Sequence, residues 1–173
     1  YLIFLNAGDA FAGDDVLSRL ADKARSGNFD ILYGQTRLVD ADRRVIGARH
    51  LTAPEHLTAD SFKRGMLVCH QAFIVRRGIA PQFDLRYRFS ADYEWCIRCL
   101  RQSHGNGYLG ENPIIDFLTI AAGTTERNHR ASLKERFDIM CRYYGTLPTI
   151  ARHLSFIPRY FREKRRKKGY CKK

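Results

Sequence analysis

Four short segments carry polar side chains that could take part in catalysis or ligand binding. The first of them is Asn6-Ala-Gly-Asp9. It follows Tyr1–Leu5, an apolar run without alternation, which predicts a buried strand covered on both faces. Asn, Gly and Asp predict a turn after that strand. A carboxylate at such a strand end can hold Mg²⁺ or Mn²⁺ beside a bound phosphate, because these ions prefer oxygen ligands. The alternative is an ordinary strand-to-helix turn in which Asp9 only caps.

The second segment holds Asp92 and Glu94 at the start of a helix that we predict from Ser90 to about Ser103. On a helix these two carboxylates point in different directions, so one can face a cleft while the other faces elsewhere. Unpaired backbone N–H groups at a helix N-terminus stabilise negative charge, which suits Asp92 as a general base. The alternative is that both acids only decorate a first helical turn.

The third segment is Cys69-His70-Gln71, which leads into apolar residues as far as Val75. Two large polar side chains inside an apolar run need hydrogen-bond partners. The segment therefore predicts either the floor of a pocket for a polar ligand such as a sugar, or a core histidine whose hydrogen bonds are satisfied.

The fourth segment is Ala122-Gly-Thr-Thr125, followed by Arg127 and His129 before a helix that contains Glu135. Hydroxyl groups, cations and a helix N-terminus together predict a diphosphate clamp. His129 can also complete a metal site. The alternative is a solvated loop before a capped helix.

The chain has five cysteines, an odd number, and no secretion signal, which indicates reduced thiols in the cytosol. Cys96-x-x-Cys99 has the spacing of a zinc ligand pair that Cys69 and His70 can complete. Helical periodicity over residues 91–100 favours the other interpretation, in which these cysteines pack in a core.

The elements that must position these side chains alternate between strands and helices. Phe29 to Val39 is predicted to be a strand, with a second strand near Val45-Ile46, and Ser132 to Tyr144 is predicted to be a helix. This order indicates an α/β protein whose sheet is parallel at its start and has an antiparallel insertion. Ligands bind in loops after the strands of such sheets, which is the position of Asn6–Asp9.

The net charge of +12 is concentrated at the C-terminal end of the chain. Residues 159–173 contain nine Lys and Arg against one acid, Glu163, so the tail carries +8 and the rest of the chain +4. Aromatic and aliphatic side chains lie among these cations over residues 152–173, which is typical of a segment that binds an anionic membrane surface. A solvated terminus is the alternative. Nucleic-acid binding is a rival function, but the charge is terminal and we find no recognition motif.

In their order along the chain, these segments resemble the family 2 glycosyltransferases of GT-A fold, in particular bacterial members that build cell-surface polysaccharides. The resemblance covers residues 1–145. It implies a GT-A-like mixed sheet flanked by helices over that range, without the N-terminal nucleotide-binding part, and a helical, basic tail over 146–173. The motifs that carry it are Phe-Leu-Asn-Ala-Gly-Asp9, Tyr33-Gly, His70-Gln71-Ala-Phe, Phe83-Asp-Leu-Arg-Tyr87, Ala91-Asp-Tyr-Glu-Trp95 and Gly123-Thr-Thr.

The resemblance implies a role for each site residue. Asp92 matches the catalytic base, with Ala91 in place of the acid that usually precedes it. Asp9 is the one carboxylate left in the metal motif, because Asn6 and Gly8 stand where the family has acids. The remaining assignments are His129 to the metal site, Asn6, Gly8, Thr124, Thr125 and Arg127 to the donor diphosphate, and His70, Gln71, Tyr87, Glu94 and Trp95 to the acceptor side.

The implied reaction is a single displacement with inversion. Asp92 removes a proton from an acceptor hydroxyl, which attacks the anomeric carbon of a nucleotide-sugar, and Mg²⁺ or Mn²⁺ neutralises charge on the departing diphosphate. The acceptor is a saccharide or a lipid-linked sugar, and the enzyme works in the cytoplasm or at the inner face of the membrane.

The family has strand-helix units before the metal motif, on the order of 60 to 90 residues, that this chain does not contain. We therefore expect weak donor binding by the chain alone. The alternative is a non-catalytic remnant or partner of a complete transferase.

Overall fold

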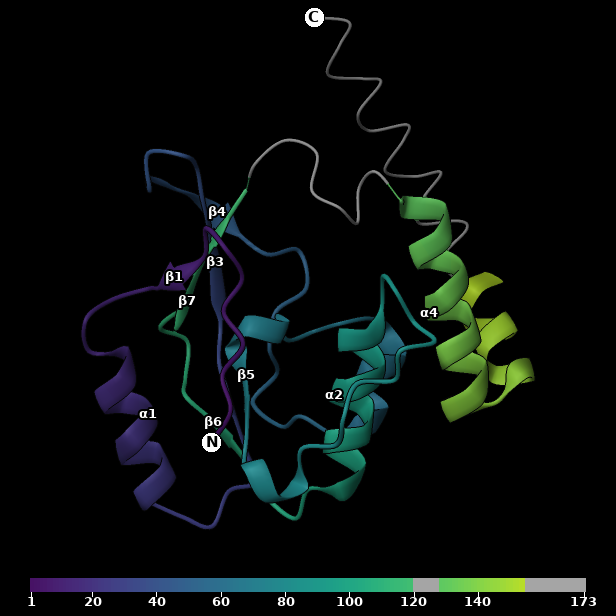
Figure 1. The fold of residues 1–173 in the computed structure, drawn as a ribbon, viewed down its shortest axis with the longest axis horizontal. Coiled ribbons are helices and arrows are strands. Elements are labelled where there is room, and N and C mark those ends of the chain that lie inside the picture. Colours follow the sequence, from purple (N-terminus) through teal and green to yellow (C-terminus); the bar gives the residue numbers. More distant parts are fainter. Residues whose placement is uncertain (120–127, 155–173) are drawn as a thin grey trace, which may run out of the picture. The chain divides into compact units, whose positions relative to one another are not determined.

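The computed structural model describes residues 1–119 and 128–154 (Figure 1). It divides the chain into two compact units, Tyr1–Ser132 and Leu133–Lys173, which we describe separately. This division lies inside helix α4 (His129–Tyr144). The domain boundary after residue 145 stays a prediction.

A three-stranded sheet forms the centre of the first unit. Its strands are ordered β5 (Phe73–Val75), β2 (Ile31–Tyr33) and β6 (Asn106–Tyr108). β2 runs antiparallel to β5 and parallel to β6. All residues of β2 and β5 are buried, as expected of strands covered on both faces.

The first unit also contains a four-stranded sheet, which carries the candidate site at one end. Its order is β1 (Ala10–Phe11), β7 (Ile115–Leu118), β3 (Thr36–Val39) and β4 (Val45–Ala48). β3 is parallel to β7 and antiparallel to β4. With helices beside these mixed sheets, the predicted α/β mixed-sheet fold class is confirmed.

The single strand predicted over residues 29–39 is wrong, because the chain changes sheets at Gly34-Gln35. The Gly34 N–H donates to the carbonyl of Ala72. The Gln35 side chain donates to the carbonyl of Ala53 at 2.9 Å and accepts from its N–H at 3.1 Å. These bonds fix the crossing point, and β2 and β3 therefore belong to different sheets.

Residues Tyr1–Leu5 do not form a strand that is buried on both faces. The segment makes one antiparallel bridge, between Leu2 and Val75. Its side chains alternate, with Leu2 and Phe4 half-buried and Tyr1, Ile3 and Leu5 exposed. The predicted buried strand is therefore wrong here, although Tyr1 on the more exposed face donates to the carbonyl of Phe29 at 2.6 Å.

Two α-helices flank the strands of the first unit (Figure 1). α1 spans Val16–Arg25 and contacts β2. α2 spans Ala91–Gln102 and contacts the 3₁₀ helices Ala59–Arg64 and His70–Ala72. The predicted helix after Ser90 is thus confirmed.

The described part of the second unit is helical. It comprises the rest of α4, which confirms the helix predicted there, and residues 146–154. Among the described residues of both units, no helix has the length and apolar character needed to span a membrane.

A buried ion pair stabilises α2 one turn after its start. Glu94 is 1% exposed and accepts a hydrogen bond from Arg98 at 2.8 Å, while the Arg98 side chain is 24% exposed. Arg98 also donates to the carbonyl of Gln82 at 2.7 Å, which ties the helix to the loop before it. Removing one partner of such a pair costs more than the pair contributes, because the other charge stays buried.

We therefore expect Arg98→Met to lower the free energy of unfolding by about 3 kcal/mol, measured by urea denaturation. The matched control is Arg25→Met, which breaks the i,i+3 pair with Asp22 in α1, where both side chains are 77% exposed. That change is expected to cost less than about 0.5 kcal/mol. Equal losses in the two variants would contradict the role given to the buried pair.

Candidate active site

The turn Asn6–Asp9 presents the first predicted site carboxylate. The Asp9 N–H donates to the carbonyl of Asn6 at 3.0 Å. Gly8 has φ +92°, the left-handed region that the third position of such a turn requires. A Cβ at Gly8 would lie 2.8 Å from Cδ2 of Leu118. Gly8 is thus needed for the turn, whereas the contact with Leu118 involves only the end of a side chain that can move.

Both oxygens of the Asp9 carboxylate are held by hydrogen bonds. The N–H of Leu118, at the end of β7, donates to Oδ1 at 2.8 Å. Nε2 of Gln71, which is buried, donates to Oδ2 at 2.6 Å. Two predicted site residues that lie 62 positions apart are therefore in direct contact.

His70 lies in a cluster of aromatic rings beside Gln71. Its ring stacks on Phe4 with centroids 5.1 Å apart and meets the edges or faces of Trp95 at 5.6 Å and Phe83 at 5.9 Å. Its Nε2 is buried and has no hydrogen-bond partner among the described residues. Burial lowers the pKa of His70, and the nearby Asp92 carboxylate opposes that shift. The imidazole is therefore neutral at neutral pH, and a ligand could reach Nε2 only if neighbouring side chains moved.

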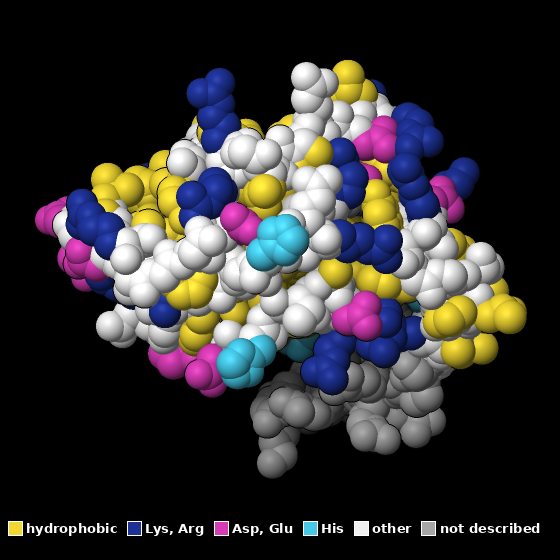
Figure 2. Space-filling model, turned by 90° about the horizontal axis from the view of Figure 1, so that it is seen from below, with side chains coloured by type: hydrophobic (Ala, Val, Ile, Leu, Met, Phe, Trp, Pro, Cys, Tyr) yellow, Lys and Arg dark blue, Asp and Glu magenta, His cyan; other side chains and the backbone are white. Residues whose placement is uncertain are grey.

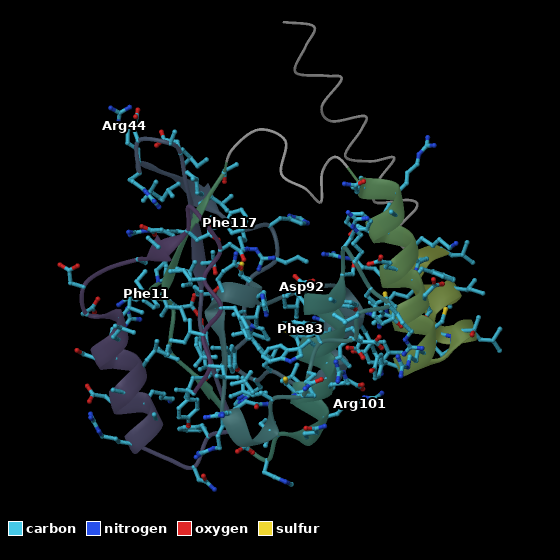
Figure 3. All side chains as sticks on the ribbon, viewed as in Figure 1. Phe11, Arg44, Phe83, Asp92, Arg101 and Phe117 are labelled. Carbon is cyan, nitrogen blue, oxygen red and sulfur yellow. The ribbon has the colours of Figure 1, made fainter. Side chains whose placement is uncertain are left out.

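Asp92 lies in the first turn of α2, near Phe83 in the view of Figure 3. It is half-exposed, and its Oδ1 accepts a hydrogen bond from the N–H of Tyr93 at 2.8 Å. Its charge acts on His70, and Gln71 contacts Asp9. The adjacent residues His70 and Gln71 thus connect the two carboxylates predicted to carry the chemistry.

The other residues assigned to the acceptor side lie deeper. Glu94 is buried in its ion pair. Trp95 is buried, donates from Nε1 to the carbonyl of Pro81 at 2.6 Å and stacks on Phe83 at 5.3 Å. Tyr87 is half-buried and ends the turn that begins at Asp84. Because Glu94 and Trp95 are buried, direct contact of either side chain with an acceptor stays a prediction.

The residues present fit a divalent cation held by one protein carboxylate. An ionised carboxylate has about four lone-pair sites, of which two are used at Asp9. Mg²⁺ needs one or two carboxylates and takes further ligands from substrate phosphates. No group of three or more His, Cys, Asp or Glu comes together within 1–119 and 128–154, so His129, the first residue of α4, is not gathered with Asp9 and a third such side chain.

The zinc site considered from the sequence is not assembled in the described residues. Cys96 and Cys99 are buried free thiols, and burial raises the pKa of Cys99 to about 12. With Cys69 and His70 they form no metal cluster in the described part of the chain. These cysteines pack in the core. Thr124, Thr125 and Arg127 lie outside the described residues, so their assignment to the donor diphosphate stays a prediction.

Three contributors to the site escaped the sequence analysis. The Leu118 N–H is a backbone group, which no residue type reveals. Phe4 was assigned to a strand core, although it stacks on His70. Cys69 was named there as part of its segment and as a possible zinc ligand, but not for the hydrogen bond that its Sγ donates to Oε1 of Gln71 at 2.7 Å.

The lowered pKa of His70 predicts a pH dependence of stability. The unfolded chain binds a proton near the ordinary pKa of about 6.5, before the folded chain does. Stability is therefore fully present above about pH 6.5 and falls as the pH is lowered toward the folded-state pKa. We expect His70→Phe, which keeps a ring in the cluster, to flatten this part of the profile in urea unfolding between pH 5 and 7.

The control for that profile is His56→Asn at an exposed position, which should keep the wild-type slope. An unchanged slope in His70→Phe, or an imidazole that titrates at or above the ordinary value in NMR, would contradict the placement of His70.

The chain has sequence relatives among known proteins. No family model matches the chain. It is 38% identical over 106 residues to the PGL/p-HBAD biosynthesis glycosyltransferases of Mycobacterium bovis (strain BCG / Pasteur 1173P2) and Mycobacterium tuberculosis (strain ATCC 25177 / H37Ra). The match covers 57% of this chain and 37% of each relative. The chain thus spans well under half the length of the curated relatives that it matches.

A solved structure shares the fold. The chain superposes on the crystal structure of S. aureus TarS 1-349 with a TM-score of 0.54, over 90% of this chain and 47% of that one, at 13% sequence identity. At this identity the likeness concerns the fold alone. The chain is therefore a sequence relative of named glycosyltransferases, built on a fold that TarS shares.

Proposed function

We propose that this chain is the acceptor-side part of an inverting, metal-assisted glycosyltransferase of family 2 and GT-A fold, with Asp92 as its general base. One observation carries the proposal: Gln71 donates a hydrogen bond to the Asp9 carboxylate, and its neighbour His70 lies within the electrostatic influence of Asp92. The mycobacterial relatives are named as glycosyltransferases, which supports glycosyl transfer as the reaction.

Asp92 is suited to accept a proton from an acceptor hydroxyl. Its carboxylate is half-exposed at a helix N-terminus, so it is reachable from solvent and its negative charge is stabilised by the helix. His70 lies beside Asp92 with its Nε2 buried, so it acts on Asp92 without presenting a hydrogen-bonding atom to solvent. The rings of Phe4 and Phe83 hold His70 in place, and a fixed orientation of the acceptor favours attack from one side of the donor sugar.

Asp9 is the residue that would hold Mg²⁺ or Mn²⁺. When bound, the cation supplies neutralisation of the charge that develops on the departing nucleoside diphosphate. Asn6 and Gly8 shape the turn that presents Asp9. Thr124, Thr125, Arg127 and His129 complete the donor side in the proposal, on sequence grounds.

The proposed substrates are a nucleotide-sugar donor and a saccharide or lipid-linked acceptor, in the synthesis of a surface polysaccharide. Biosynthesis of PGL and p-HBAD is what the names of the relatives give for those proteins. Nucleic acid is the less favoured partner. In the face drawn in Figure 2, Lys and Arg are interspersed with Asp and Glu instead of forming one continuous basic patch.

The test of the base assignment is Asp92→Asn, assayed for transfer or hydrolysis of nucleotide-sugars in the protein translated from its complete reading frame. We expect kcat to fall by about 10² to 10⁴, the usual contribution of a general base, with little change in stability. Asp14→Asn, at an exposed position before α1, should leave kcat unchanged. Wild-type turnover in Asp92→Asn would contradict the assignment.

We also propose that the C-terminal part of the chain binds an anionic membrane surface on the cytoplasmic side. Leu147, Ile150 and Leu154 are 80%, 40% and 59% exposed, and their spacing places them on one face of the helical residues 146–154. The +8 charge of residues 159–173 follows directly in the sequence. An apolar helix face next to a basic segment is the pattern of interfacial binding.

Co-sedimentation with vesicles of phosphatidylglycerol and phosphatidylcholine tests this proposal. We expect Leu147→Ser/Leu154→Ser to weaken binding by about thirtyfold or more, since each leucine contributes roughly 1 kcal/mol or more when it leaves water. A chain truncated after Pro158 should lose most of the salt-sensitive binding. Leu85→Ser, at a 92% exposed position in the first unit, is the matched control. Equal binding by all four proteins would contradict a lipid-binding role for this segment.

A further inference from the structure

Gln71 uses both ends of its side-chain amide inside the protein. Its Oε1 accepts from Sγ of Cys69 at 2.7 Å, and its Nε2 donates to Oδ2 of Asp9 at 2.6 Å. Gln71 and Cys69 are both buried. A buried thiol, a buried amide and the candidate metal ligand thus form a continuous chain of hydrogen bonds.

The orientation of the amide follows from the chemistry of its two neighbours. Burial raises the pKa of the Cys69 thiol, so Sγ carries its proton and acts as a donor. An ionised carboxylate can only accept. The amide carbonyl must therefore face Cys69 and the amide N–H must face Asp9, because the reverse orientation would place two acceptors against each other.

We propose that Gln71 is a positioning residue for the Asp9 carboxylate and that Cys69, which does not touch Asp9, holds the Gln71 amide in place by donating to its Oε1. The inference rests on the proposed function in taking Asp9 as the cation ligand. Gln71 fixes Oδ2 and the Leu118 N–H fixes Oδ1. Each oxygen keeps a lone pair beyond its hydrogen bond, so the fixed carboxylate can still serve a cation whose other ligands come from a diphosphate.

This arrangement explains why the residue types matter. A glutamate at position 71 would bring a second carboxylate against Asp9, and a leucine would leave Oδ2 without its donor. An alanine at position 69 would leave the buried Oε1 of Gln71 without the donor that holds the amide in place, whereas a serine would supply another donor at nearly the same place. The role of Cys69 is therefore hydrogen bonding, and its conservative replacement should preserve it.

The experiment is an NMR titration of the ¹⁵N-labelled 173-residue chain with Mn²⁺ in the presence of inorganic pyrophosphate. Paramagnetic broadening of the Leu118 amide reports binding at Asp9. The side-chain NH₂ signals of Gln71 report the chain of hydrogen bonds from Cys69 through Gln71 to Asp9. We expect Gln71→Leu and Cys69→Ala to weaken Mn²⁺ binding about five- to tenfold, the loss of one charge-assisted hydrogen bond. Cys69→Ser should bind as the wild type does, and Asp9→Ala should abolish the broadening.

Cys99→Ala is the matched control, because it truncates a second buried cysteine that has no contact with Gln71 in the described structure. It should bind Mn²⁺ normally and leave the Gln71 signals in place, whereas Cys69→Ala should shift them. Unchanged Mn²⁺ affinity in Gln71→Leu, or failure of Cys69→Ser to restore it, overturns the positioning role. A protein that transfers no sugar but whose Mn²⁺ affinity follows Cys69 and Gln71 as described contradicts the proposed function and supports this inference.

Discussion

The hydrogen bond between Gln71 and Asp9 is the contact on which the candidate site depends. It joins the turn after the first extended segment to the 3₁₀ helix before β5, which are otherwise distant in the chain. Without it, Asp9 would be held only by the end of β7. His70, the neighbour of Gln71, lies within the electrostatic influence of Asp92 in the first turn of α2.

The rest of the first unit holds this contact in register through buried charges. Asp116, two residues before Leu118 in β7, pairs with Arg37 of β3. Arg37 also donates to the carbonyl of Ala12, just after β1, at 2.9 Å. β1 and β7, the two strands next to Asp9, are thus both tied to β3 by Arg37. On the opposite side, the Glu94–Arg98 pair fixes α2 against the loop at Gln82. Positioning of both carboxylates therefore depends on ion pairs that are largely shielded from water.

Much of this arrangement could be predicted from the sequence, and the exceptions have physical reasons. The Asn6–Asp9 turn follows from local chemistry, because glycine acts over a few residues. The helix after Ser90 was predicted with Ser90 as its cap, but the Ser90 side chain makes no cap hydrogen bond and bonds to Ser132 instead. The change of sheet at Gly34-Gln35 could not be predicted, since it depends on Ala53 and Ala72, which lie far along the chain. The exposure of Ile3 and Leu5 depends likewise on which elements lie beside them. The contact of Asp9 with the Leu118 N–H involves a backbone group that every residue has.

The central claim is that Asp9 and Asp92 belong to one site that transfers a sugar with inversion. The most direct measurement is the anomeric configuration of the sugar released or transferred from UDP-, GDP- and dTDP-sugars, recorded by ¹H NMR before mutarotation in the protein translated from its complete reading frame. The account predicts a product with the configuration opposite to that of the donor, because a single carboxylate base supports one displacement. A product with retained configuration, or no turnover of any of these donors, would contradict it.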